Sequence, residues 1–364
     1  MLAADLPKIS ADAHVDEPHD LWYERLPESL REGAPRRIQG NEEGGWTLVV
    51  NGDAVGWDDA SVTEARALEA DRAAAASPRV RFEMMRRDGV NAEVIYPTIG
   101  LYMWNVADPA VGDAGCRIYN DWIREQLGGE SRIKLAAMLP TWTLELALAE
   151  IARVGDDPSI GGLLLPLVGT PEWNLPQWEP LWAALAEIGK PVVMHQGTGH
   201  DMIFYRGWGS ATANLLTTQS MAARATALLS CSGVLERHPA LHVVLVEVNA
   251  GWLAWTMSTL DEYYQAHESW SKPKLDELPS HYIRRQIHAT FQTDPVAVHN
   301  IPLTGTDGLL WGNDFPHPES TYPHSNKVLD DLFVGVDERD AIAITSGNAR
   351  TLFGFDDSVL AARP

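Results

Sequence analysis

Ionisable side chains are concentrated in residues 11–22, which read ADAHVDEPHDLW. Within this stretch, Asp12 and His14 are spaced i and i+2 at the end of an apolar run that begins near Lys8. If that run is a strand, both side chains leave it on the same face. A carboxylate and an imidazole on one face are ligands that divalent metals accept. The stretch therefore predicts either a metal site or a solvent-filled loop at the mouth of a fold.

Polar residues of the same kinds follow several later apolar runs of the chain. A single His in such a place is usually a core residue, and a single Asp often caps the next helix. They become informative only if the fold brings the ends of their strands together. The residues concerned are His195, Glu247, Asp294 and Asp314.

Short apolar or β-branched runs alternate with helical stretches along the chain, as expected for a parallel sheet covered by helices. Eight such units predict an α/β fold, a (β/α)8 TIM barrel. We expect strands at 8–12, 92–97, 134–140, 161–166, 191–195, 242–247, 288–293 and 308–312. Helices are expected at 113–127, 144–154, 178–188, 214–237, 251–266 and 326–333.

In a barrel of this kind, catalytic residues lie at the carboxyl ends of the strands, whereas polar residues at strand starts serve stability. His238, His242 and His288 stand at strand starts, so we expect structural or surface roles for them. Asp12 and His14 would instead converge with the later strand-end residues. Because several N and O donors from separate strands suit a divalent ion, the sequence predicts a transition-metal site there.

The segment between the first two predicted strands is much longer than an ordinary connection. It contains TLVVNGDAVGW, in which Asn51 and Gly52 lie between two extended runs, the strongest short signal for a hairpin. We expect residues 22–90 to form an inserted cap with a hairpin and a helix over the barrel mouth. The whole chain, 1–364, is then a single metal-dependent barrel domain.

Composition excludes several other classes of protein. Lys and Arg total 28 against 50 Asp and Glu, a formal charge of −22, which disfavours nucleic acid and anionic membranes as partners. The chain lacks the roughly 18 consecutive apolar residues of a membrane span and the layout of a signal peptide, so we expect a cytoplasmic protein. Cys116 and Cys231 are the only cysteines, so a metal must be held by His, Asp and Glu.

Four motifs give the sequence a family resemblance that spans nearly the whole chain. They are Asp12-Ala13-His14, VVMHQG around His195, LLWGNDFPHPE around Asp314, and ITSGNARTLFGF near the C-terminus. Together they resemble the amidohydrolase superfamily, in the branch of aminocarboxymuconate-semialdehyde decarboxylase and the aromatic-acid decarboxylases. The resemblance implies that Asp12, His14, His195 and Asp314 are metal ligands. It also implies a homodimer, for which the Trp-rich insertion would offer apolar surface.

One departure from the family pattern concerns the sixth strand, where the decarboxylases carry a His as proton donor. Here the stretch reads HVVLVEVNAGW, with Glu247 near that position. Glu247 is therefore either a general acid or base, or a further ligand. With Glu17 and His317 close in sequence, five to seven donors exceed what one open catalytic ion needs, so a carboxylate-rich site for two ions is an alternative to a site for one.

The leading functional prediction is a metal-dependent decarboxylase or hydrolase acting on a small carboxylic acid or acid derivative. In it Asp314 would accept or relay a proton, and Arg206 or a basic residue of the insertion would meet the substrate carboxylate. One alternative is a nonheme iron oxygenase that uses the same ligands and is binuclear if the site holds two ions. Another is a metal-stabilised binding protein without turnover. The sequence does not identify the substrate.

Overall fold

Eight parallel strands form the central sheet of the molecule, and their order in the sheet follows their order in the sequence. The computed structural model describes residues 3–39, 46–58, 75–169, 172–199, 205–317 and 319–361. The strands are apolar and almost wholly buried, as expected for a parallel sheet with side chains inside and helices outside. They are β1 (Ile9–Val15), β5 (Ala92–Pro97), β6 (Ile133–Met138), β7 (Ile160–Val168), β8 (Val192–Gly199), β9 (Val243–Val246), β10 (Ile287–Phe291) and β11 (Leu309–Trp311).

The barrel closes where the segment after β11 meets β1. The amide of Asp314 donates to the carbonyl of Asp12 at 2.8 Å, and the amide of His14 donates to the carbonyl of Phe315 at 2.6 Å. A side-chain bond of 2.9 Å between Ser10 and Asn313 adds to this join. Gly312 is required there, because a Cβ at this position would lie 2.4 Å from the Cβ of Asp12. The predicted (β/α)8 barrel is therefore confirmed.

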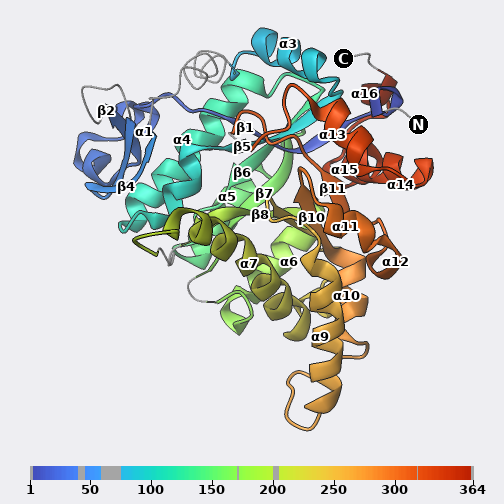
Figure 1. Ribbon diagram of the computed structural model, residues 1–364. Coiled ribbons are helices and arrows are strands. Elements are labelled where there is room, and N and C mark those ends of the chain that lie inside the picture. Colours follow the sequence, from blue (N-terminus) through green and yellow to red (C-terminus); the bar gives the residue numbers. More distant parts are fainter. Residues whose placement is uncertain are drawn as a thin grey trace.

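Helices surround the sheet on its outer side (Figure 1). The longer ones are α4 (Pro109–Leu127), α5 (Leu144–Val154), α6 (Glu179–Ile188), α7 (Ser210–Cys231), α9 (Trp252–Ala266), α10 (Pro279–Gln286) and α13 (Ser325–Leu332). Short helices and helical turns connect them: η1 (Ala3–Asp5), η3 (Ile99–Asn105), η4 (Pro176–Trp178), α8 (Val234–Arg237), α11 (Pro295–His299), α12 (Ile301–Thr304), α14 (Glu338–Ile342), η5 (Ala343–Gly347), α15 (Asn348–Phe353) and α16 (Ser358–Ala361).

The predicted hairpin lies between β1 and β5. Strands β3 (Trp46–Val50) and β4 (Asp53–Asp58) pair antiparallel, and β2 (Arg36–Gln39) pairs with β3 on the other side. Asn51 and Gly52 take φ angles of 55° and 82°, which a two-residue hairpin turn of this kind requires. The same segment contains α1 (Leu21–Arg25), η2 (Glu28–Gly33) and α3 (Pro78–Asp88).

A cap over the barrel mouth stays a prediction for this segment, of which residues 40–45 and 59–74 lie outside the described part. Among the described residues, no helix is both long and apolar enough to cross a membrane. Cys116 and Cys231 are both free cysteines.

Candidate metal centre

Two histidines face each other at the centre of the barrel mouth. His14 lies within β1, two residues beyond Asp12, and His195 lies in β8. The Nδ1 atom of His14 is 2.7 Å from the carbonyl oxygen of Pro97, and that of His195 is 2.9 Å from the carbonyl oxygen of Gln196. A carbonyl can only accept, so both Nδ1 atoms carry the proton, which leaves a lone pair on each Nε2.

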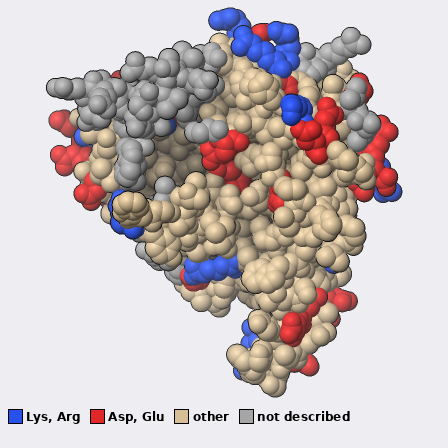
Figure 2. Space-filling view, in the orientation of Figure 1, with Lys and Arg blue, Asp and Glu red and all other residues tan. Residues whose placement is uncertain are grey.

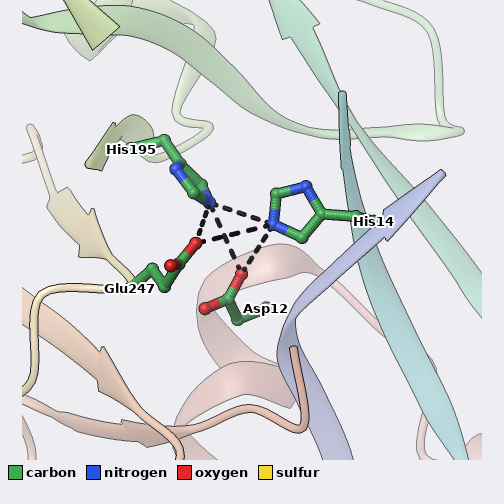
Figure 3. A group of neighbouring side chains, drawn as sticks. All are labelled: Asp12, His14, His195 and Glu247. Atoms are coloured by element: carbon green, nitrogen blue, oxygen red, sulfur yellow. Dashed lines mark hydrogen bonds and ion pairs between the residues drawn. The ribbon is translucent and has the colours of Figure 1, made fainter. Parts of the chain in front are cut away.

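The two Nε2 atoms are 3.1 Å apart and point toward each other (Figure 3). Two lone pairs at this distance repel unless a cation lies between them. Two nitrogens that bind one ion at about 2.0–2.1 Å lie roughly 3 Å apart, so the spacing suits a shared metal ion.

Asp12 adds a carboxylate to the same space. Its Oδ1 atom is 3.4 Å from Nε2 of His14 and 3.6 Å from Nε2 of His195. This oxygen is buried and has no hydrogen-bond partner in the structure. The other oxygen, Oδ2, is 3.4 Å from donors on both Thr290 and Gln292. Because a buried carboxylate oxygen without a partner is costly, the arrangement fits a divalent cation.

Three further side chains complete the cluster. Oε2 of Glu247 is 3.4 Å from Nε2 of His195, and Oδ1 of Asp314 is 3.5 Å from Nε2 of His14. His317 places Nδ1 2.9 Å from Oδ1 of Asp314 and 3.8 Å from Oε2 of Glu247.

The six side chains form two overlapping groups, in each of which the candidate ligand atoms lie within 4.8 Å of one another. Asp12, His14, His195 and Glu247 form the first group. The second contains His14, Glu247, Asp314 and His317. A mixed set of imidazole and carboxylate donors suits zinc, manganese or iron.

Two of these residues are held in an unusual backbone conformation. Glu247 and Asp314 have φ angles of 60° and 56°, in the left-handed region that non-glycine residues rarely adopt. Glu247 is fixed there partly by its amide, which donates to Oγ1 of Thr290 at 2.7 Å. Strain of this kind persists where the surrounding structure imposes it, and it is frequent at functional sites.

Burial and mutual charge shift the protonation of the cluster. Burial, followed by the neighbouring Asp314 charge, raises the pKa of Glu247 well above its ordinary value. Burial also lowers the pKa of His14 well below its ordinary value, with His317 contributing. Burial opposes the change at Asp12, but the neighbouring imidazoles of His14 and His195 lower the pKa of this carboxyl overall. The cluster therefore places the carboxyl groups of Asp12 and Glu247 beside the neutral imidazole of His14, a combination that a cation would stabilise.

The structure does not bring Glu17, Arg206 or Asp294 into either group. Both oxygens of Glu17 accept from backbone amides at the start of η3, including Ile99 and Gly100 at 2.9 Å each. Burial raises the pKa of Glu17 to about 7. Arg206 is exposed in the loop after β8. Asp294 caps α11 and accepts from the amides of Ala250 and Gly251.

Gln196 is a site residue that sequence reasoning missed. Its Nε2 atom donates to Oε1 of Glu247, and its Oε1 accepts from Oγ1 of Thr218 in α7 at 3.3 Å. Gln196 therefore directs the remaining oxygen of Glu247 toward the histidines. A neutral amide is not a metal ligand of the predicted kind, and only its position next to His195 could have drawn attention to it.

A cavity of about 290 Å³ opens beside the cluster. Its walls include His195, Glu247 and His317 of the cluster, together with Gln196 and Glu319. The remaining walls come from η3 and the first turns of α7, through residues such as Leu101 and Leu215. A small molecule in this cavity would touch the candidate ligands directly.

A (β/α)8 barrel with a His and carboxylate cluster at the carboxyl ends of its strands defines a class of metal-dependent enzymes. The sequence model of a family described as amidohydrolase matches residues 11–355. The chain therefore belongs to the amidohydrolase family, as its motifs predicted. A comparison with curated proteins found no match.

Solved structures similar to this chain share its fold. An amidohydrolase from Mycobacterium avium subsp. paratuberculosis K-10 is 18% identical with a TM-score of 0.75, covering 97% of this chain and 99% of its own. A dihydroxybenzoic acid decarboxylase from Polaromonas sp. JS666, with bound manganese and 2-nitroresorcinol, is 17% identical, with a TM-score of 0.64 and coverage of 98% and 100%.

A 5-carboxyvanillate decarboxylase from Novosphingobium aromaticivorans DSM 12444, also with bound manganese, is 14% identical with a TM-score of 0.74 and coverage of 96% and 98%. Family membership and these neighbours point to a metal-dependent decarboxylase or hydrolase that uses a divalent metal. They give no support to the alternative of a nonheme iron oxygenase.

Proposed function

We propose that this chain decarboxylates a small carboxylic acid with the help of a divalent transition metal, with hydrolysis of an acid derivative as the second candidate. The single observation that carries the proposal is the pair of facing Nε2 atoms of His14 and His195, with the unpartnered Oδ1 of Asp12 beside them. Decarboxylation comes first because two of the structures with this fold are decarboxylases of aromatic acids.

The ligand set combines the residues that the family motifs imply with the other members of the two overlapping groups. We propose that Asp12, His14, His195 and Asp314 hold one ion, and that in a two-ion site Glu247 and His317 supply the additional donors for the second. Manganese is the first metal to test, because two similar structures contain it, followed by zinc and iron. Glu17 does not belong to this set, because backbone amides already occupy its oxygens.

When bound, such an ion polarises a substrate carboxylate or carbonyl and can lower the pKa of a coordinated water. The side chains around it supply proton transfer. Decarboxylation leaves a carbon that must gain a proton, and Glu247, which lines the cavity and is held by Gln196, is placed to donate it. Asp314 and His317, 2.9 Å apart, can exchange a proton with each other and accept or relay it.

The proposal is tested by metal analysis of protein purified without chelator. We expect at least one equivalent of transition metal. Replacing His195 with Ala should release metal and abolish turnover while leaving the fold, because the barrel core lies below the site. Less than about a tenth of an equivalent of metal in the unaltered protein would count heavily against the centre, and loss of folded protein in the variant would mean that His195 is structural.

Glu247→Gln separates a ligand from a proton donor. If Glu247 binds metal, metal content should fall, from two equivalents toward one in a two-ion site. If it only donates a proton, metal should stay and the rate should fall by roughly 10²–10⁴. Unchanged metal together with an unchanged rate would contradict both roles.

Arg206 stays a prediction as the partner of the substrate carboxylate, and its exposed position outside the cavity walls gives that role no support. A cytoplasmic location stays a prediction from composition. We also propose a homodimer, supported by an apolar face on α7 and α9. Leu216 and Trp255 are 70% and 64% exposed there, beside a groove of about 650 Å³.

A further inference from the structure

The size of the cavity beside the metal centre limits what it can hold. At about 290 Å³ it lies at the lower end of the range of roughly 300–1,000 Å³ typical of small-molecule sites. Its walls combine the apolar side chains Leu101 and Leu215 with the hydroxyl groups of Thr98, Tyr102 and Thr218. An acid built on a single ring, or an open chain of similar volume, matches these dimensions.

The charges of the cavity walls are one-sided. Of the twelve described residues that line it, two are glutamates, Glu247 and Glu319, and none is Lys or Arg. Glu247 lies at the inner end beside His195, whereas Glu319 is exposed at the outer end. A ligand that enters therefore passes the carboxylate of Glu319 before it reaches the carboxyl group of Glu247.

Two described arginines near the barrel mouth are engaged by other groups, and a third, Arg206, is exposed outside the cavity walls. Arg37 lies 3.5 Å from Asp16, just after β1. Arg81 is buried, where it pairs with Glu93 and donates to the carbonyl of His14 at 2.6 Å. In Figure 2 the largest group of basic side chains lies at the upper edge, over α3, while acidic ones gather near the centre of the view.

We infer that this cavity selects acids with a single anionic group and rejects those with a second one, and that Glu319 is the residue that enforces the selection. The inference rests on the proposed function, since the one anionic group is the one that the metal would hold. A second anionic group on the ring would meet no Lys or Arg among the described walls and would lie near Glu319, where it would lose hydration and be repelled by that carboxylate. The outer half of the substrate is therefore neutral.

Three matched probes test this inference: salicylate, its 5-carboxylate derivative and its 5-carboxamide derivative. The last two have nearly the same shape and differ by one charge. Calorimetry with the manganese-loaded protein at pH 7.5 measures their binding without relying on turnover. We expect the carboxamide to bind within about threefold of salicylate and the second carboxylate to weaken binding at least about tenfold.

Two variants assign the effect to Glu319. In Glu319→Gln the gap in affinity between the 5-carboxylate and the 5-carboxamide derivatives should narrow. In Glu319→Lys it should reverse, so that the 5-carboxylate derivative binds more tightly. Glu187→Gln removes the same charge from an exposed position on α6, outside the cavity walls, and should leave the gap unchanged. A thermal unfolding curve for each variant verifies that the fold is retained.

The outcomes separate this inference from the proposed function. If the unaltered protein binds neither metal nor salicylate, the proposed function fails and the inference fails with it. If salicylate binds with metal but the carboxylate and carboxamide derivatives bind equally well, only the inference is overturned. A gap that Glu319→Gln and Glu187→Gln narrow to the same extent would show a general effect of net charge and would overturn the role of Glu319.

Discussion

Glu247 has a buried carboxyl group and a backbone in the left-handed conformation. The backbone favours a residue without a Cβ, whereas the site requires a side chain. The φ of 60° at Glu247 is unfavourable for any residue with a Cβ, by roughly 1–2 kcal/mol. The side chain, however, is needed beside His195, where its Oε2 lies 3.4 Å from Nε2. The site therefore accepts backbone strain in exchange for a carboxylate that a strand with ordinary φ would direct elsewhere.

This strain predicts the order of stability of two variants. Glu247→Gly and Glu247→Ala both remove the carboxylate, but only glycine relieves the left-handed strain. We expect the metal-free glycine variant to exceed the alanine variant by about 1 kcal/mol in free energy of unfolding, measured with urea. Equal stabilities would show that the backbone at this position is unstrained or relaxes freely.

Gln196 supports Glu247 from outside the ligand set, and its removal should weaken metal binding. Without the amide donor, Oε1 of Glu247 loses its partner and the carboxylate can rotate. Residues that orient ligands in this way typically contribute 10–100-fold to metal affinity. We expect that loss in Gln196→Leu by competition with a fluorescent chelator, and a smaller one in Thr218→Val, which is one contact further away.

The ligand cluster was predictable to the extent that strands control side-chain direction. Asp12, His14 and His195 lie inside β1 and β8, where alternation fixes the face. Glu17 lies beyond the end of β1 at Val15, where alternation no longer applies, and it turns to the amides of η3 instead. Sequence spacing alone cannot show which carboxylates backbone amides will satisfy.

At the scale of elements, the amino ends of β9 and β10 carry a histidine pair far from the metal centre. Nδ1 of His242 is 3.0 Å from Nε2 of His288, whose own Nδ1 donates to the carbonyl of Asp307. Burial, with a smaller contribution from His242, lowers the pKa of His288 from 6.5 to about 4. The structural role predicted for these residues from their places at strand starts agrees with this arrangement.

This pair predicts loss of stability in mild acid. Between pH 6.5 and 4 the unfolded chain protonates His288 but the folded chain does not, so the free energy of unfolding falls as the pH drops through this window. This loss of free energy of unfolding approaches about 3 kcal/mol at pH 4 and vanishes above pH 6.5. Urea unfolding of the metal-free protein should show that the free energy of unfolding decreases less between pH 7.5 and pH 4.5 in His288→Gln than in the unaltered protein. The exposed His281→Gln should behave like the unaltered protein.

The elements themselves were largely visible in the sequence because buried parallel strands are continuous apolar runs. All eight strands were found, and the range predicted for β5 agrees with the structure at both ends. The helix predicted at 214–237 is instead two, because Gly233 adopts a φ of 75° between α7 and α8 while the apolar spacing continues across it. The periodicity of apolar residues cannot show that a single residue adopts the left-handed conformation and ends a helix.

At the scale of the whole molecule, the exposed apolar face of α7 and α9 predicts association. Leu216, Trp255 and Val296, the last of them 56% exposed, border the same groove of about 650 Å³. Exposed apolar surface of this kind is unfavourable in a monomer. We expect light scattering at micromolar concentration to give about twice the 40.1 kDa of one chain, and Trp255→Glu to give one chain. A monomeric unaltered protein would remove the proposal.

A metal ion bound at the join between the first and last strands would also stabilise the closed barrel. Ser10 and Asn313, which bond across the join, are 303 positions apart. Bringing such distant points of a chain together costs roughly (3/2)RT ln n, about 5 kcal/mol. Asp12 and His14 lie in β1, and Asp314 follows β11. An ion bound to all three would therefore connect the two ends of the chain as a crosslink does. Resistance of both termini to proteases would then follow the supply of metal, so the ion that the chemistry needs would also set the lifetime of the protein.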